Sequence, residues 1–111
     1  MWKIYILLAI AMAVVSLPAH SDKLALSTCE YIAADDKKRL RSLLKQNRMK
    51  IKTLHKMVFC NNQTILLFAD TRQAKDVGEL IIKKLPKKVV AEALPSLTSE
   101  QLIAAANNRI N

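Results

Sequence analysis

The side chains with the most reactive chemistry in this 111-residue sequence are Cys29, Cys60 and His55, which stands between the two cysteines. The thiols could form a disulfide, remain free as nucleophiles, or ligate zinc together with His55. There is no C-x-x-C pair, and three scattered donors make a poor zinc site. An even number of cysteines in a small exported protein is typical of a disulfide. We expect the Cys29–Cys60 disulfide, with free thiols and a metal site as the alternatives, and no cofactor.

Acid–base catalysis would need a histidine or carboxylate that a partner orients. His55 is followed by Lys56 and has no acid at helical spacing. The one pair of adjacent carboxylates, Asp35-Asp36, is explained by capping of the helix that follows. We therefore predict no catalytic residue and no enzymatic activity. A deep pocket that held His55 beside a carboxylate, for example Asp70 or Glu79, would revive the enzyme hypothesis.

A run of positive charge is the strongest local feature that could bind a ligand. Between Lys37 and Lys56 there are nine basic residues and no acid. On a helix, four of them fall within an arc of about 80°, roughly opposite the leucines at 40, 43 and 44. These four are Lys38, Arg41, Lys45 and Arg48. We predict that this basic stripe attracts an anionic partner; the alternative is a solvated helix face on a basic protein.

The identity of the anion is constrained by composition and by export. Nucleic-acid binding is helped by aromatic side chains that stack on bases, and after residue 21 the chain has only Tyr31, Phe59 and Phe68. Nucleic acid is therefore an unfavourable partner. We expect an acidic protein or an anionic envelope surface.

Residues 1–21 have the three parts of a secretory signal peptide. Lys3 provides the positive start, residues 4–15 form an apolar run of 12 residues, and small residues at 19 and 21 precede the expected cleavage point. The run is too short to span a bilayer, which needs about 20 apolar residues. We predict cleavage after Ser21, which leaves residues 22–111 as one domain with no transmembrane segment. Loss of Lys3 leaves 17 basic and nine acidic residues, a net charge of +8.

Scarce glycine and abundant leucine, lysine and alanine predict an all-α fold for this domain. We expect about six short helices in stacked antiparallel hairpins, over residues 28–34, 36–47, 62–71, 76–85, 87–94 and 98–108. Residues 48–60 are expected to be a connector with a short helix near 52–58. The motif Ile32-Ala33-Ala34-Asp35 has a faint echo 35 residues later in Leu67-Phe68-Ala69-Asp70. This period suits stacked helical hairpins; the alternative is that short amphipathic helices resemble one another.

Helix starts are predicted from capping residues. The capping-box spacing occurs at Ser27-Thr28-Cys29-Glu30, at Asp76-Val77-Gly78-Glu79 and at Thr98-Ser99-Glu100-Gln101. Asn61-Asn62 is expected to be both a turn and the cap of the helix that follows it. Gly78 lies inside a predicted helix, where it either permits close approach of another helix or is a tolerated weak position.

Cys29, Cys60-Asn61-Asn62 and Leu67-Phe68-Ala69 resemble the motifs of a family of small exported bacterial domains of unknown function, domain-of-unknown-function family 3718. In that family we would expect a signal peptide, a helix that opens with cysteine, a basic leucine-rich helix, and a Cys-Asn turn before a helix with a Phe-Ala pair. The resemblance covers residues 23–84. It implies export and a paired Cys29 and Cys60, but it implies no activity. Asn62 stands where the family tends to have glycine; asparagine also tolerates a left-handed turn.

The function that best fits these features is a periplasmic or secreted, non-enzymatic interaction module whose basic helix binds an anionic partner. The alternative is a structural or stress-related envelope protein with no dedicated ligand.

Overall fold

The computed structural model of the protein describes residues 19–111. The predicted signal peptide therefore lies almost wholly outside the described residues. Its expected cleavage point after Ser21 falls near the start of the first described helix. Within residues 19–111, no helix combines the length and the apolar character that a membrane span requires.

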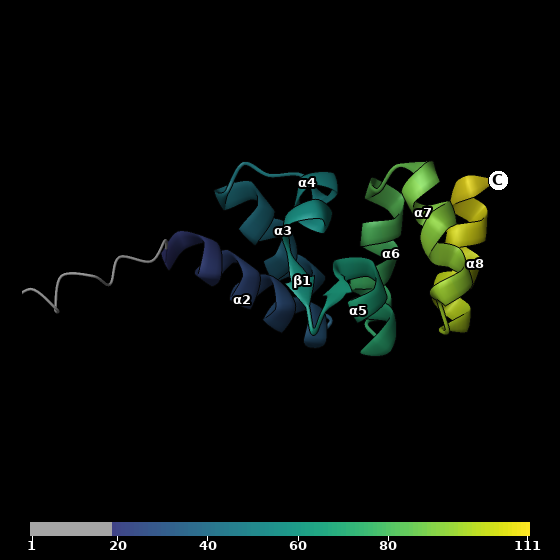
Figure 1. The fold of residues 1–111 in the computed structure, drawn as a ribbon, viewed down its shortest axis with the longest axis horizontal. Coiled ribbons are helices and arrows are strands. Elements are labelled where there is room, and N and C mark those ends of the chain that lie inside the picture. Colours follow the sequence, from purple (N-terminus) through teal and green to yellow (C-terminus); the bar gives the residue numbers. More distant parts are fainter. Residues whose placement is uncertain (1–18) are drawn as a thin grey trace, which may run out of the picture.

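Over residues 19–111 the chain forms seven α-helices, one short 3-10 helix and two very short strands (Figure 1). In chain order these are α2 (Ala19–Ala33), α3 (Lys37–Gln46), α4 (Ile51–Met57), β1 (Phe59–Cys60), β2 (Gln63–Thr64), α5 (Ile65–Thr71), α6 (Lys75–Lys84), α7 (Lys87–Ala93), η3 (Leu94–Ser96) and α8 (Glu100–Ile110). The predicted all-α fold is confirmed, with the small strand pair as an addition to it.

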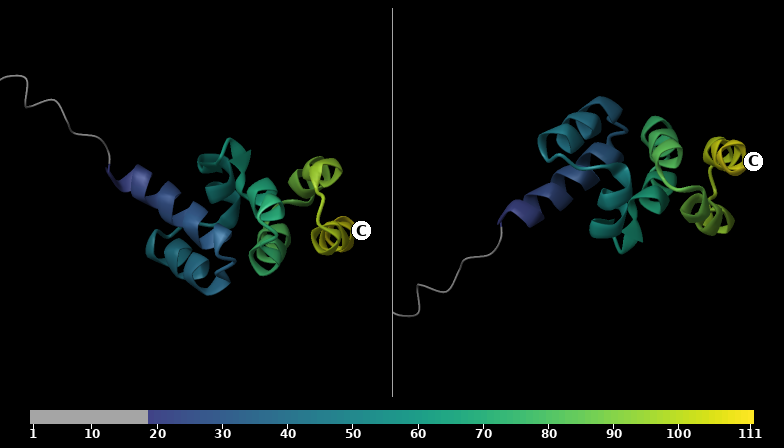
Figure 2. Two further views of the ribbon diagram at one scale, coloured as in Figure 1. Left: turned by 90° about the horizontal axis from the view of Figure 1, so that it is seen from below. Right: turned by 90° about the horizontal axis from the view of Figure 1, so that it is seen from above.

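The helices form three hairpins that stack side by side: α2 with α3, α5 with α6, and α7 with α8 (Figures 1 and 2). The middle hairpin contacts both neighbours, because α5 packs on α2 while α6 packs on α3 and on α8. This arrangement confirms the predicted stacking. It also places Lys84, in the last turn of α6, beside α3.

The core runs through all three hairpins, and each α-helix described contributes apolar side chains to it. Burial of such side chains stabilises the fold by roughly 1.5–3 kcal/mol each before entropy is counted. The largest fully buried apolar side chains are those of Ile32, Leu40, Leu54, Ile65, Leu66, Ile81, Ile82, Leu85, Leu102, Val77 and Val90.

The first helix begins nine residues earlier than predicted. Leu24, Thr28 and Ile32 stand four residues apart on α2 and are all buried, so one continuous stripe of the helix packs against the core. The capping box expected at Ser27 is therefore wrong. Thr28 lies inside the helix, and its hydroxyl donates a hydrogen bond to the carbonyl oxygen of Leu24 at 2.7 Å. Cys29 likewise lies inside α2 and does not open it.

Residues 59–64 form a tight β-hairpin that the sequence analysis assigned partly to a helix. Phe59 pairs with Thr64 and Cys60 with Gln63. Asn61 and Asn62 have φ of 53° and 63°, the left-handed values that a two-residue hairpin turn of type I′ requires. The predicted turn is confirmed. The predicted capping by these asparagines is wrong, because Thr64 caps α5 by accepting a hydrogen bond from the Leu67 amide at 3.3 Å.

Two carboxylates next to each other cap two different helices. Asp36 caps α3 as predicted, accepting from the Arg39 amide at 3.0 Å. Asp35 instead reaches across to α6 and accepts from the amides of Asp76 and Val77 at 3.3 and 2.8 Å. The expected capping box at Asp76 is therefore wrong: α6 begins at Lys75, and its N-terminal amides are satisfied by a residue some 40 positions away.

Asp70 makes a similar long-range cap at the start of α8. Its carboxylate is 3% exposed and accepts hydrogen bonds from the Thr98 amide, the Thr98 hydroxyl and the Ser99 amide, at 2.8 to 3.1 Å. Ser99 is the N-cap of α8 and accepts from the Leu102 amide. The capping box predicted at Thr98–Gln101 is therefore wrong: the N-cap is Ser99, and Gln101 donates its hydrogen bond to Glu79 on α6 instead of reaching back to Thr98.

Gly78 permits close contact between α6 and α8. A Cβ atom at this position would lie 2.6 Å from a methyl carbon of Leu102, which is fully buried. Of the two interpretations of Gly78, close approach of another helix is confirmed.

A disulfide between Cys29 and Cys60 joins α2 to β1. Both thiols are consumed, so the alternatives of free cysteines and of metal ligation by them do not apply to this structure. Closing a loop of this length stabilises a fold by about 3–4 kcal/mol in the chain-entropy treatment.

Candidate anion-binding groove

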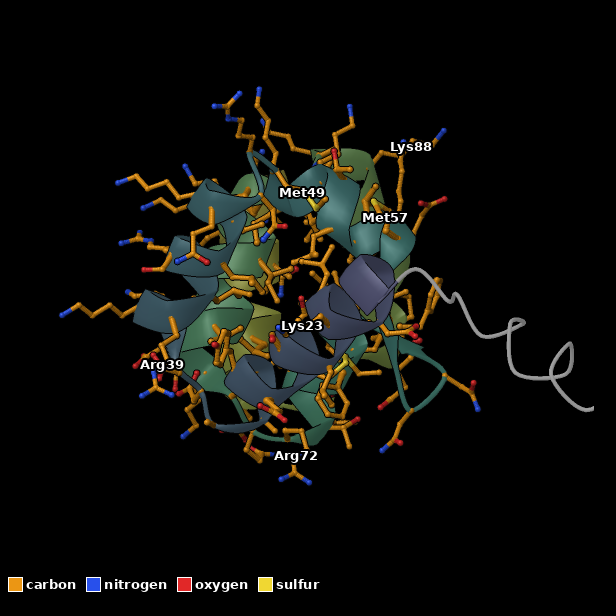
Figure 3. The ribbon with its side chains drawn as sticks, turned by 90° about the vertical axis from the view of Figure 1, so that its left-hand side faces the viewer. Lys23, Arg39, Met49, Met57, Arg72 and Lys88 are labelled. Atoms are coloured by element: carbon orange, nitrogen blue, oxygen red, sulfur yellow. A yellow bond between two sulfur atoms is a disulfide. The ribbon has the colours of Figure 1, made fainter. Side chains whose placement is uncertain are left out.

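Helix α3 holds most of the predicted basic stripe. The cap at its start and its buried leucine determine which face of the helix is exposed. Asp36 caps the first turn, and Leu40 is fully buried against the rest of the domain. Lys38, Arg41 and Lys45 are exposed. Figure 3 shows long side chains with nitrogen at their tips projecting from the side of the molecule on which Arg39 is labelled. Three of the four predicted residues therefore share one exposed helix face.

Arg48 departs from the stripe. Helix α3 ends at Gln46, and Arg48 has a left-handed φ of 49°. The amides of Arg48 and Met49 bond back to the carbonyl oxygens of Lys45 and Leu44 at 3.2 and 2.9 Å, which closes the helix end. The helical projection used in the sequence analysis thus does not apply at Arg48. It is exposed, but it is not among the residues that line the groove described next.

An open groove with a volume of about 540 Å³ lies along the exposed face of α3. We call it the basic groove. It is lined by Lys37, Lys38, Arg41, Ser42, Lys45 and Lys84. Lys84 comes from the last turn of α6, and the sequence analysis missed it. The only sequence signal was the basic pair Lys83-Lys84, and nothing local to that pair indicates that α6 packs beside α3.

A second hollow of about 470 Å³ adjoins the basic groove and shares Arg41 and Lys84 with it. We call it the adjoining hollow. It is lined by Arg41, Leu44, Met49, Lys50, Ile51, Lys52, Leu80 and Lys84. Its apolar residues come from α3, α4, α6 and the turn between α3 and α4, and its other residues are cations. Lys50 and Lys52 belonged to the basic run in the sequence, and the turn after α3 brings them to this side.

None of the cations that line the basic groove forms an ion pair within residues 19–111. Among residues 19–111, the one ion pair within 4.0 Å joins Arg39 to Asp36 at 3.4 Å, and it lies outside the groove. Two of the groove cations, Lys37 and Arg41, also line a smaller hollow that contains Asp76 and Glu79. Glu79 there accepts a hydrogen bond from the Gln101 amide group at 2.7 Å. The groove therefore presents several uncompensated positive charges to an approaching anion.

His55 is half-buried, and its Nε2 atom has no hydrogen-bond partner. Burial without such a partner disfavours the charged imidazolium and lowers the pKa of His55. The two carboxylates considered as its partners are engaged elsewhere, Asp70 with Thr98 and Ser99 and Glu79 with Gln101. In the part of the chain that the structure describes, no cluster of three metal-ligating side chains occurs.

Together the fold and the groove define a class: a small all-α protein of stacked helical hairpins, linked by one disulfide and carrying a basic groove. The sequence profile of a family described as "Protein of unknown function (DUF3718)" matches residues 28–92. The chain belongs to this family. The matched segment includes both cysteines and all the residues that line the basic groove and the adjoining hollow. No curated protein and no solved structure is significantly similar to the chain.

Proposed function

We propose that this protein is an exported, non-enzymatic interaction module that binds an anionic partner through the basic groove. The proposal rests on one observation: cations from α3 and α6 line the same open groove, and none of them forms an ion pair with an acidic residue. Placing like charges together costs free energy unless a ligand or counterions neutralise them. A bound anion would supply that neutralisation.

Export to the periplasm or beyond is supported by two independent features. The first 21 residues have the composition of a signal peptide, and the disulfide suits an oxidising compartment. The mass of the native protein taken from its own cell envelope tests this part. We expect a mass that lacks residues 1–21, whereas retention of these residues on the native protein would contradict cleavage there.

The binding part is tested with polyglutamate as the anionic probe. The double variant Arg41→Glu/Lys45→Glu should weaken binding by about tenfold or more, because it turns two groove cations into repulsive anions. Raising the salt concentration should weaken binding by the unaltered protein, since exposed charges are screened beyond about 8–10 Å at physiological ionic strength.

The matched control is Arg72→Glu/Lys88→Glu, which makes the same change in net charge. Arg72 and Lys88 are exposed and lie outside both the groove and the hollow (Figure 3). We expect this control to bind nearly as the unaltered protein does. Equal losses in the two double variants would mean that net charge alone drives binding, and would overturn the assignment of the groove. Absence of any binding would instead favour a structural envelope protein without a ligand.

A further inference from the structure

We infer that the basic groove and the adjoining hollow together bind an acidic peptide segment of a partner protein, which inserts one apolar side chain into the hollow. This inference rests on the proposed function and adds the chemistry of the partner to it. It is supported by the row of cations along α3 and by the apolar residues in the hollow beside that row.

The groove cations are spread along a line and do not converge on one point. Lys38, Arg41 and Lys45 follow each other at intervals of three and four residues on α3, which separates them by about 4.5–6 Å along the helix axis. Alternate side chains of an extended peptide are about 6.6 Å apart. An acidic segment can therefore offer one carboxylate to each cation in turn. A single phosphate group could contact only one or two of them.

The adjoining hollow provides a site for an apolar anchor. Leu44 and Met49, which line it, are only half-buried and so remain partly open to solvent, and Leu80, which also lines it, is 5% exposed. Arg41 and Lys84 line both the hollow and the groove. A peptide whose carboxylates contact the α3 cations can therefore extend into the hollow at Arg41 and Lys84. Filling such a pocket with one apolar side chain is the usual source of strong contacts at an interface.

A flat membrane surface fits these features less well. A surface that binds anionic lipid combines basic residues with protruding apolar side chains that enter the bilayer. The large apolar side chains that do protrude in residues 22–111 are Leu26, Met57 and Phe59, at 62%, 56% and 57% exposure. None of them lines the groove or the hollow, and the apolar side chains that line the hollow are half-buried or buried. The observations therefore favour a peptide that can enter the hollow.

The test uses three probes with the purified, oxidised protein. The first is a 12-residue peptide in which glutamate alternates with serine and one central position is leucine. The second is the same peptide with alanine in place of that leucine. The third is a vesicle of phosphatidylcholine that contains phosphatidylglycerol. Affinities are measured by fluorescence anisotropy for the peptides and by co-sedimentation for the vesicles.

We expect the leucine peptide to bind at least tenfold more tightly than the alanine peptide. Arg41→Glu/Lys84→Glu should remove most of the binding, while the Arg72→Glu/Lys88→Glu control should retain it. The variant Met49→Ser should reduce the advantage of leucine over alanine. Because the comparison of the two peptides needs no altered protein, it remains decisive if Met49→Ser fails to fold.

Three other outcomes would contradict the apolar anchor, the peptide partner or the groove itself. Equal, charge-dependent binding of both peptides would overturn the apolar anchor and leave the proposed function standing. Binding to vesicles in the absence of peptide binding would overturn the peptide inference in favour of a lipid surface. Failure of every probe to respond to Arg41→Glu/Lys84→Glu would overturn the inference and the proposed function together.

Discussion

Aspartate side chains hold the hairpins of this protein together at the points where helices begin. Asp35, in the first hairpin, accepts hydrogen bonds from backbone amides at the start of α6. Asp70, in the middle hairpin, accepts hydrogen bonds from the amides of the two residues before α8. These two aspartates end the faint sequence echo between positions 32–35 and 67–70. The echo therefore has a physical counterpart, because each aspartate satisfies backbone amides of the next hairpin in the stack.

Replacement of Asp70 by alanine should lower the free energy of unfolding by about 2–4 kcal/mol, because it leaves the buried Ser99 amide and the partly buried Thr98 amide without their acceptor. Urea denaturation measures this loss. The control is Asp36→Ala, which removes a more exposed cap on α3 and should cost about 1 kcal/mol. A loss for Asp70→Ala no greater than that of the control would show that water or another side chain replaces the carboxylate.

At the scale of elements, the contact between α6 and α8 depends on the absence of a side chain at Gly78. Glycine inside a helix costs about 1 kcal/mol relative to alanine, yet here a Cβ atom would lie within 3 Å of the Leu102 side chain. The local preference for alanine and the tertiary contact therefore oppose each other. Overpacking of a closed core costs about 1–3 kcal/mol. We therefore expect the steric cost of an alanine at position 78 to exceed the gain from its better helix propensity.

We expect Gly78→Ala to destabilise the protein by about 1 kcal/mol as the net of these two effects. In a protein that already carries Leu102→Ala, the same substitution should be stabilising, because the obstructing methyl groups are gone and only the helical preference remains. Thermal or urea unfolding of the four proteins in this cycle provides the measurement. The same sign of effect in both backgrounds would contradict the proposed steric cause.

At the scale of the whole molecule, the Cys29–Cys60 disulfide ties the long N-terminal helix to the β-hairpin that precedes α5. A domain of this size has a small core and marginal stability, so a single crosslink is a large fraction of its free energy of unfolding. The disulfide and the cap by Asp70 hold opposite parts of the stack. The first fixes the α2 side, and the second fixes the start of α8.

The double variant Cys29→Ser/Cys60→Ser should be less stable than the oxidised protein by about 3–4 kcal/mol, because its unfolded chain regains the freedom that the crosslink removes. Denaturation of the two proteins under identical conditions measures the difference. The unaltered protein in reductant should approach the stability of the variant. Alkylation of both thiols in native, unreduced protein would contradict the crosslink itself.

Much of this protein follows from local sequence. Scarce glycine and abundant leucine, lysine and alanine predicted an all-α fold, and the positive run predicted a basic face on α3. The turn at Asn61-Asn62 was likewise readable, because asparagine tolerates the left-handed backbone that the turn requires. These features depend on a residue and its near neighbours, so no tertiary information was needed for them.

The remaining features were decided by packing between segments far apart in the chain. The early start of α2, the caps supplied by Asp35 and Asp70, and the close approach at Gly78 all depend on partners that local patterns do not identify. The basic groove belongs to this group as well. Lys84 joins Arg41 only because α6 packs against α3, so the sequence could predict a charged helix face but not the groove that the face lines.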